Sequence, residues 1–173
     1  IRTQVEAAGA AAAGQTALDE SLLEEVTYLV EDSTPLCGSF EEKYLQLPRE
    51  LLVTSMKEHQ RYFTIEDAEG KLLNKFITVS NTRPEDPEVV IKGNERVIRA
   101  RLSDAMFFWE EDQKQPLAGN LEMLKQVIYQ AKLGSSYEKV ERFAALAVSL
   151  AEQFEPAACE LTARAAMLSK CDL

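Results

Sequence analysis

Apolar residues recur at helical spacing in several segments of the chain. The first such stripe consists of Leu18, Leu22, Val26, Leu29 and Val30. This spacing predicts an amphipathic helix, and Asp19 or Ser21 is expected to cap its N-terminus. Ser21 and Glu24 also match a capping box, in which each side chain binds the free backbone N–H of the other residue. The helix is expected to end before Pro35.

A helix and two strands are expected next. Pro48 suits the first turn of a helix, and Leu52 and Met56 give that helix an apolar face. A polar turn at residues 66–70 closes on a glycine and is flanked by aromatic and β-branched runs that contain Tyr62, Phe63, Ile65, Phe76, Ile77 and Val79. This arrangement predicts a β-hairpin, and the polar segment 80–84 is expected to end its second strand.

Pro87 is expected to open a further helix, either continuous or in two pieces around Gly93 and Asn94. Its apolar face follows the i, i+4, i+7, i+11 pattern with Ile98, Leu102, Ala105 and Trp109. The aromatic run at 107–109 cannot face a single core from three consecutive positions. At least one of Phe107, Phe108 and Trp109 is therefore expected to pack against a neighbouring module.

The pattern after Pro116 is helical throughout. Asn120 and Gly134 are expected to begin and end a helix with Leu121, Leu124, Ile128 and Ala131 inside. Ser135 and Glu138 match a second capping box. The helix after it has an apolar face with Val140, Phe143, Ala147, Leu150 and Phe154. Pro156 is expected to begin a last helix with Leu161, Ala165 and Leu168 inside.

These elements predict an α+β fold, in which a mixed helix and hairpin module precedes the beginning of an all-helical domain. We expect a weakly ordered Ala-rich lead-in at 1–17, the α+β module at 18–116 and the helical part at 117–173, with the boundary within 112–119. The chain starts without Met and stops within a helical pattern. It is therefore expected to be an internal piece of a longer protein.

Composition narrows the class of protein. A content of 46% hydrophobic and 28% charged residues in 173 positions is typical of a soluble globular protein. No apolar run approaches the roughly 18 residues needed to span a bilayer, and no secretory signal is visible. The three cysteines are far apart and odd in number, which favours a reducing, cytoplasmic setting. The net charge of −10 argues against general nucleic-acid binding but leaves room for a local basic face.

No catalytic constellation is evident. Phosphate-binding glycine loops and the nucleophile-elbow pattern are absent, so no catalytic residue is assigned. His59 is the only histidine, and no second histidine is available to share a metal ion with it. We therefore expect no metal site and interpret His59 as a packed, hydrogen-bonded residue at a helix end.

Cations and aromatics gather in two segments, 56–63 and 93–109. The candidate RNA-binding residues are Lys57, Arg61, Arg96, Arg99 and Arg101. Helical spacing places Arg96 and Arg99 on one face of the predicted helix and Arg101 on a different face. In the alternative interpretation these arginines pair with Glu95 and Asp104 on a solvated face, while Lys57 and Arg61 satisfy buried carboxylates or carbonyls. The residues interpreted as structural are His59, Gln60, Tyr62, Phe63, Asn81, Asn94 and Asp104.

The sequence also resembles a known family. Segments 22–31, 47–81, 93–117, 129–147 and 166–173 are similar, in order and spacing, to the beta subunit of bacterial glycyl-tRNA synthetases of the two-chain α2β2 type. The most specific runs are MKEHQRYF, GNERVIRARLSDAMFF and LSKCDL. The lead-in 1–17 matches only loosely.

The resemblance implies that glycine and ATP, with Mg, bind the alpha subunit and that this chain holds no cofactor and is inactive alone. The implied partners are the alpha subunit, tRNA-Gly and a second beta subunit, with no membrane and no DNA. The implied role is tRNA binding and α2β2 assembly for ATP-dependent glycylation of tRNA-Gly. A purely structural interface role without RNA contact is the alternative, and an editing or phosphohydrolase activity of its own is a third.

Two sub-regions carry their own resemblance. Residues from about 20 to 115 are similar to the editing-type module of phenylalanyl-tRNA synthetase. Residues from about 117 onward resemble the start of an HD-type helical domain, whose His and Asp side chains hold a metal ion. Cys171 and Asp172 stand where an HD dipeptide might be sought, and the helical part contains no histidine. A helical scaffold without a metal is therefore expected there, and the anticodon-binding domain of the family is expected to lie outside this chain.

Overall fold

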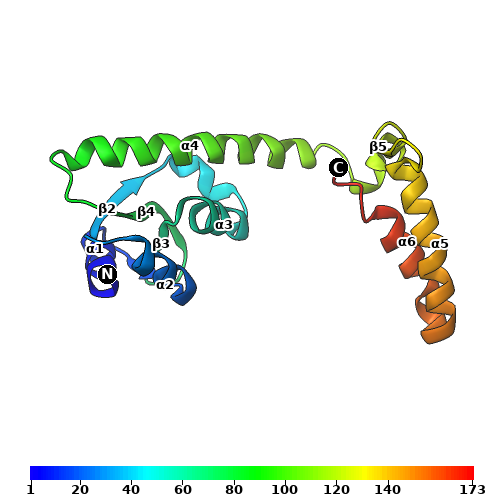
Figure 1. Ribbon diagram of the computed structural model, residues 1–173, viewed down its shortest axis with the longest axis horizontal. Coiled ribbons are helices and arrows are strands. Elements are labelled where there is room, and N and C mark those ends of the chain that lie inside the picture. Colours follow the sequence, from blue (N-terminus) through cyan, green and yellow to red (C-terminus); the bar gives the residue numbers. More distant parts are fainter. The chain divides into compact units, whose positions relative to one another are not determined.

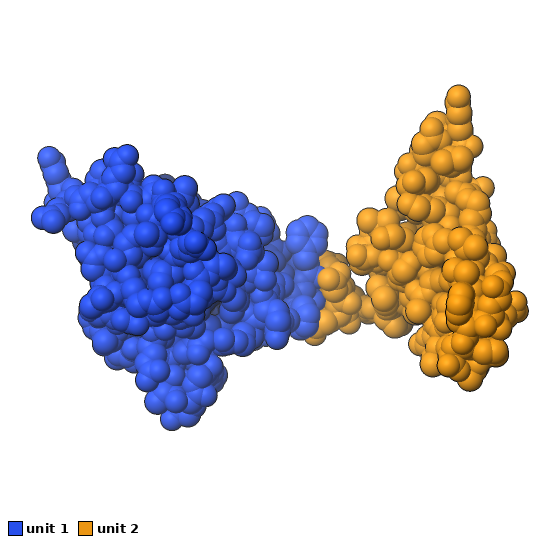
Figure 2. All heavy atoms as spheres, turned by 60° about the horizontal axis from the view of Figure 1, so that its bottom comes forward, with its two compact units in different colours: residues 1–109 blue, residues 110–173 orange.

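A computed structural model describes all residues from Ile1 to Leu173. The chain divides into two compact units, Ile1–Trp109 and Glu110–Leu173, which Figure 2 shows in different colours. The division falls a few residues before the predicted boundary at 112–119. Helices together with antiparallel strands confirm the predicted α+β class. No helix has the length and apolar character needed to cross a membrane.

The centre of unit 1 is a four-stranded antiparallel sheet with the strand order β1-β3-β4-β2. These strands are β1 (Gln15–Ala17), β2 (Thr34–Ser39), β3 (Phe63–Glu66) and β4 (Leu72–Ser80). The predicted hairpin is confirmed as β3 and β4, with Phe63 opposite Ile77. Gly70, at φ 78°, supplies the left-handed conformation in its turn.

The expectation of weak order at 1–17 is wrong. Residues Arg2–Ala11 form helix α1, whose Val5 is fully buried, and β1 pairs with β3. Helix α1 approaches β1 closely at Gly9, which has no side chain. A Cβ at this position would lie 2.2 Å from Oγ1 of Thr16 and would prevent this packing. The partner strand of β1 lies far along the sequence, so apolar periodicity within the lead-in does not reveal the pairing.

Helix α2 (Glu20–Leu29) begins at Asp19, whose carboxylate accepts a hydrogen bond from the amide of Leu22. The predicted Ser21–Glu24 capping box does not form, since the Ser21 hydroxyl instead donates to Asp19 at 2.5 Å. Leu22, Leu23 and Val26 are buried, whereas Leu29 is exposed, contrary to the predicted stripe. The helix therefore buries only its first two turns.

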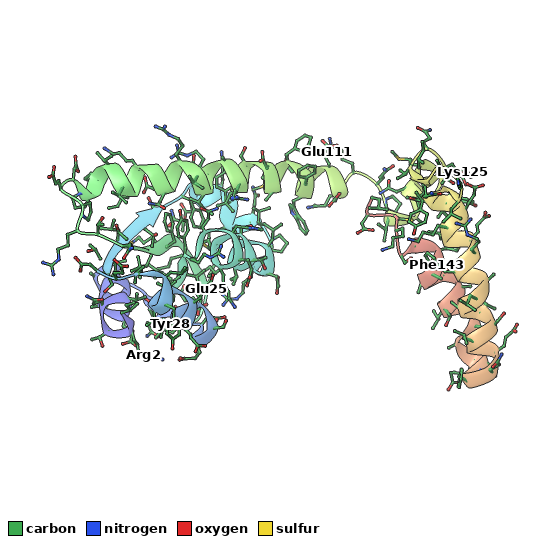
Figure 3. All side chains as sticks on the ribbon, in the orientation of Figure 1. Arg2, Glu25, Tyr28, Glu111, Lys125 and Phe143 are labelled. Atoms are coloured by element: carbon green, nitrogen blue, oxygen red, sulfur yellow. The ribbon has the colours of Figure 1, made fainter.

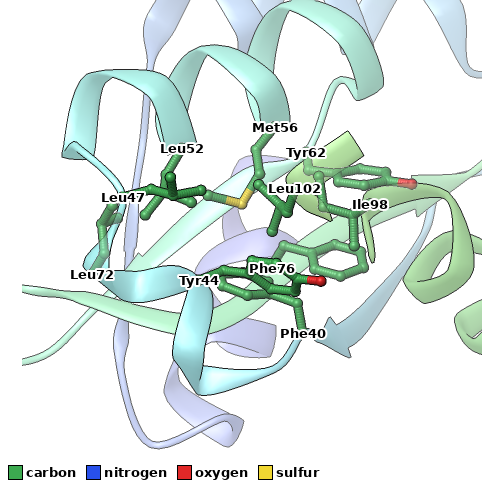
Figure 4. Close-up of a cluster of buried hydrophobic side chains, with 10 residues drawn as sticks. All are labelled: Phe40, Tyr44, Leu47, Leu52, Met56, Tyr62, Leu72, Phe76, Ile98 and Leu102. Carbon is green, nitrogen blue, oxygen red and sulfur yellow. The ribbon is translucent and has the colours of Figure 1, made fainter. Parts of the chain in front are cut away.

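The sheet lies between two layers of helices (Figure 1). One core cluster, drawn in Figure 4, lies against the 3-10 helix η1 (Glu42–Gln46), α3 (Arg49–Gln60) and α4 (Pro87–Asp112), and contains Phe40, Tyr44, Leu47, Leu52, Met56, Tyr62, Leu72, Phe76, Ile98 and Leu102. The other lies against α1 and α2 and contains Val5, Leu22, Leu23, Val26, Phe63, Ile65 and Ile77. Phe76 and Ile77 enter opposite clusters, as the period of two in a strand requires.

Helix α4 is continuous through Gly93, so the two-piece alternative is wrong. Ile98 and Leu102 are fully buried and confirm the predicted apolar face. Burial stops at the part-buried Ala105 and Met106, and the aromatic run 107–109 is exposed. The C-terminal part of α4 extends past α3, which explains why these rings lack core contacts within unit 1 (Figure 1).

Unit 2 begins differently from the prediction. Instead of an Asn120-capped helix it has the 3-10 helix η2 (Leu117–Lys125) and a short hairpin of β5 (Ile128–Gln130) and β6 (Gly134–Ser135). Ile128 is 79% exposed and not inside, and Gly134, at φ 86°, belongs to the hairpin and is not a helix C-cap. The side chain of Asn120 donates to the carbonyl of Cys171 at 3.1 Å.

The remaining elements of unit 2 are α5 (Ser136–Phe154), the 3-10 helix η3 (Pro156–Ala158) and α6 (Cys159–Leu168). The Ser135–Glu138 capping box is confirmed at the start of α5. The buried core consists of Leu124, Val140 and Cys171, with the half-buried Phe143, labelled in Figure 3, packed against it. The predicted inner residues Leu150, Phe154 and Leu161 are exposed, because helical spacing predicts an apolar face but not what covers it.

Candidate functional site

The segment 56–63 joins the end of α3 to β3. Arg61 ends α3 in the left-handed conformation, at φ 56° and ψ 38°. The amide of Arg61 donates to the carbonyl of Lys57 at 3.0 Å, and the amide of Tyr62 donates to that of Met56 at 2.9 Å. This hydrogen-bond pattern closes the helix and turns the chain into the sheet.

The two cations of this segment bind helix α2 and its cap. The Nζ of Lys57 lies 2.6 Å from Asp19, and the Nε of Arg61 lies 2.9 Å from Glu25, which is labelled in Figure 3. The pKa of Asp19 is lowered mainly by the hydrogen bond from Lys57. Hydrogen bonds from the Ser21 hydroxyl and the Leu22 amide lower it further. The same pairing raises the pKa of Lys57. Both carboxylates are over 40% exposed, so the predicted carboxylate partners are present but are not buried. The predicted carbonyl partner is found for Arg61, whose guanidinium also donates to the carbonyl of Glu58 at 3.0 Å.

A hollow of about 220 Å³ lies beside the Lys57–Asp19 pair. Leu18, Leu22 and Val53 contribute apolar walls. Arg49 also lines it and is itself paired with Glu66. The cations beside the hollow are therefore already balanced by carboxylates of this chain.

The aromatic residues of the segment belong to the core. Tyr62 stacks on Phe76 with ring centroids 4.4 Å apart, and its phenol donates a 2.6 Å hydrogen bond to Oδ1 of Asn94 on α4. Burial raises the pKa of Tyr62 to about 12. Asn94 also donates from Nδ2 to the carbonyl of Val90. Phe63 is buried in the opposite cluster, so both rings of the segment support the fold.

The other residues interpreted as structural differ among themselves. Asn81 accepts hydrogen bonds from the amides of Glu31 and Asp32 and so fixes the chain between α2 and β2. His59 is exposed and its ring has no hydrogen-bond partner, so its predicted packing is wrong. Gln60 is half-buried at the last position of α3, and Asp104 is exposed on α4.

The three arginines of α4 lie in different surroundings. The Nε of Arg99 lies 2.9 Å from Glu41, whereas Arg96 and Arg101 are exposed and have no carboxylate partner. The predicted pairing with Glu95 and Asp104 is wrong. Glu95 instead accepts hydrogen bonds from the amide and hydroxyl of Ser39 at the end of β2. The five candidate RNA-binding cations thus do not form one continuous basic face.

The sequence does not reveal the acidic partners of these cations. It predicts Asp19 only as a helix cap and gives no signal for Glu25 or Glu41. Each lies far along the chain from its cation, so no local spacing rule connects them. No group of three or more His, Cys, Asp or Glu side chains is placed to hold a metal ion, and the absence of a metal site stays a prediction.

Comparison with known proteins identifies the family. The glycyl-tRNA synthetase beta subunit family matches the chain over residues 1–173. The chain belongs to this family. The glycine–tRNA ligase beta subunit of Syntrophotalea carbinolica is 64% identical over 155 residues, which are 90% of this chain and 22% of that protein. Those of Geotalea uraniireducens and Geobacter sulfurreducens are each 56% identical over all 173 residues, or 25% of their own length.

The chain therefore spans about a quarter of the length of the curated relatives that it matches. The resemblance inferred from MKEHQRYF and GNERVIRARLSDAMFF is confirmed at the level of the family. In this chain, Lys57, Arg61 and Arg99 form ion pairs that join different elements of unit 1. Arg96 and Arg101 on α4 have no carboxylate partner.

Proposed function

We propose that the chain is part of the beta subunit of a two-chain glycyl-tRNA synthetase and contributes to tRNA-Gly binding and α2β2 assembly. The observation that carries this proposal is the family match over the whole chain. We assign ATP-dependent glycylation, with ATP and Mg, to the alpha subunit and expect the enzyme to work in the cytoplasm. A second beta subunit completes the proposed assembly.

The experiment uses the full-length beta chain together with its alpha subunit. The segment corresponding to residues 1–173 is deleted, and association with alpha and affinity for tRNA-Gly are measured with and without it. We expect the deletion to weaken one or both. Circular dichroism and thermal unfolding of the remaining chain serve as the folding control, and a tRNA for another amino acid serves as the binding control. A folded deletion variant with unchanged assembly and unchanged tRNA-Gly affinity would contradict the proposal.

A purely structural role is the second candidate, and the ion pairs favour it. Lys57, Arg61 and Arg99 each contact a carboxylate of this chain, so their charge is balanced within the chain and is not free to contact phosphates. On this interpretation Arg61→Ala lowers the free energy of unfolding and leaves the tRNA-Gly affinity of the folded enzyme unchanged. A loss of affinity without a loss of stability would exclude the structural role for Arg61.

A further inference from the structure

The last two turns of α4 differ in chemical character. The first is apolar at four consecutive positions, and we call it the aromatic turn: Met106, Phe107, Phe108 and Trp109. The second is acidic at the three positions that end the helix, and we call it the acidic turn: Glu110, Glu111 and Asp112. An α-helix has about 3.6 residues per turn, so each set extends around the helix axis and does not lie on one face.

Within unit 1 the aromatic turn is covered on one side. Met106 packs against the core cluster of Figure 4, and its sulfur accepts a hydrogen bond from Nε2 of Gln46 at 3.6 Å. The three rings remain accessible, since Phe107 is 56% exposed, Phe108 63% and Trp109 36%. The two phenylalanine rings contact each other edge to face, with centroids 5.4 Å apart. Large apolar side chains that are exposed together on one turn are typical of a binding surface.

The arrangement of the three rings indicates the form of the site that binds them. A surface helix is apolar along one stripe, whereas a helix that is apolar all round is buried on all sides. Successive positions on α4 differ by about 100° around the axis, so Phe107, Phe108 and Trp109 point in three different directions. A flat partner surface covers only one of these directions. The aromatic turn therefore fits a socket that encloses it.

The acidic turn indicates the charge of that socket. Its three carboxylates lie at the C-terminus of α4, where the helix dipole already places about half a negative charge. No basic residue lies in the last turn of the helix, and the nearby Lys114 pairs with Glu111 alone. A partner that binds here is therefore expected to place Lys or Arg side chains around the mouth of its apolar socket.

We infer that the aromatic turn inserts into an apolar socket of the alpha subunit whose rim carries Lys or Arg side chains, an inference that rests on the proposed function. Charge disfavours the other members of the proposed assembly. The phosphates of tRNA have the same sign as the acidic turn, which repels them. A second copy of this chain carries the same net charge of −10, and most arginines of unit 1 already pair with its own carboxylates.

The first test measures the association of the full-length beta chain with its alpha subunit by biolayer interferometry. F107A with F108A should weaken the association by about 30-fold or more, because buried aromatic side chains dominate the binding energy of protein interfaces. The matched control is Tyr28→Ala, which removes a ring that is 83% exposed on α2 and should leave the association unchanged. The replaced rings are largely exposed, so both variants are expected to keep the wild-type midpoint of thermal unfolding.

The second test examines charge. Association of the wild-type chains should weaken as salt rises, because salt screens the attraction between the acidic turn and the basic rim. E110K with D112K should weaken the association by about 10-fold at low salt and abolish its decline with salt. The control E24K with E31K makes the same change of charge at two exposed glutamates of unit 1 and should change neither property.

Four outcomes would overturn the inference. The first is unchanged association with the alpha subunit in both F107A with F108A and E110K with D112K. The second is a lower midpoint of thermal unfolding for the beta chain alone in F107A with F108A but not in Tyr28→Ala, which would mean that the beta chain itself covers the aromatic turn. The third is a loss of tRNA-Gly affinity, and the fourth a loss of pairing between beta chains, with association to the alpha subunit unchanged.

The deletion of residues 1–173 separates this inference from the proposed function. If the deletion weakens association with the alpha subunit and the variants of the aromatic and acidic turns do not, the inference fails and the proposed role in assembly stands. If the wild-type beta chain does not associate with the alpha subunit, the proposed role in assembly fails, and the inference fails with it.

Discussion

The phenol of Tyr62 donates a 2.6 Å hydrogen bond to Oδ1 of Asn94 and so joins the residue before β3 to the second turn of α4. The Tyr62 ring is 2% exposed and belongs to the core cluster shown in Figure 4. A buried phenol needs a hydrogen-bond partner, and Asn94 is the group that supplies it. This bond and the buried side chains Ile98 and Leu102 together hold α4 against the hairpin.

A double-mutant cycle measures this bond. Tyr62→Phe should lower the free energy of unfolding by about 1 kcal/mol, and Asn94→Ala by about 1–3 kcal/mol because it leaves a buried phenol without an acceptor. The double variant should lose less than the sum of the two, since either change already breaks the bond. Urea denaturation provides the values. Tyr28→Phe is the control and should have no effect, because Tyr28 is 83% exposed.

Arg61 permits a test of its left-handed backbone. Arg61→Gly removes both the side chain and the conformational cost of φ 56°, whereas Arg61→Ala removes the side chain and keeps that cost. We expect the free energy of unfolding of Arg61→Gly to be about 1 kcal/mol higher than that of Arg61→Ala. The pair with Glu25 is half-exposed, so its loss should cost no more than about 1 kcal/mol in either variant.

The neighbouring position is the matched control for this comparison. Gln60 is the last residue of α3, where glycine is unfavourable. There the order should reverse, with Gln60→Ala more stable than Gln60→Gly in thermal or urea unfolding. Equal stability of the two Arg61 variants would show that position 61 does not adopt the left-handed conformation in solution.

Asp19 should make stability depend on pH in the acid range. Its pKa is lower in the folded protein than in the unfolded chain, mainly through the hydrogen bond from Lys57. A lowered folded-state pKa contributes stability above the unfolded value, near pH 4, and this contribution is lost as the pH falls below it. Asp19→Asn keeps a capping side chain but removes the ion pair. The variant should therefore be less stable than wild type at pH 7, and the difference should shrink at pH 3.

Two further variants sharpen the Asp19 experiment. Asp19→Ala should cost about 1 kcal/mol more than Asp19→Asn at pH 7, because it also removes the acceptor for the Leu22 amide. Asp104→Asn, which removes a carboxylate without an ion-pair partner, should change stability little at either pH. A constant difference between wild type and Asp19→Asn from pH 7 to pH 3 would contradict the role of the ion pair.

Two glycines should respond to alanine in opposite directions. A Cβ on Gly93 would meet no atom within 4 Å, and the residue lies within α4, so Gly93→Ala should raise the free energy of unfolding by about 0.5–1 kcal/mol. A Cβ on Gly38 would lie 2.5 Å from Cζ of the buried Phe76, so Gly38→Ala should lower it by about 1–3 kcal/mol. Chemical denaturation distinguishes the two, and a stabilising Gly38→Ala would mean that β2 does not pack on Phe76.

Local features of the sequence predicted the elements that depend on near neighbours. The hairpin of β3 and β4 follows from two aromatic and β-branched runs around a glycine turn. The burial of Leu52 and Met56 follows from helical spacing, and the Ser135–Glu138 box follows from capping chemistry within one turn. The same local reasoning failed for Asn120, where apolar spacing indicated a helix but the chain forms a 3-10 helix and a short hairpin.

The sequence by itself determined the family through specific runs such as MKEHQRYF. It also determined the α+β class and most helices of unit 1, because periodicity, caps and turns act over a few residues. Only the tertiary structure decided which charges are paired. Lys57 meets a carboxylate 38 positions away and Arg61 one 36 positions away, and such choices depend on how helices pack on the sheet. For the same reason only the fold distinguishes Arg99, paired with Glu41, from the unpaired Arg96 and Arg101 on the same helix.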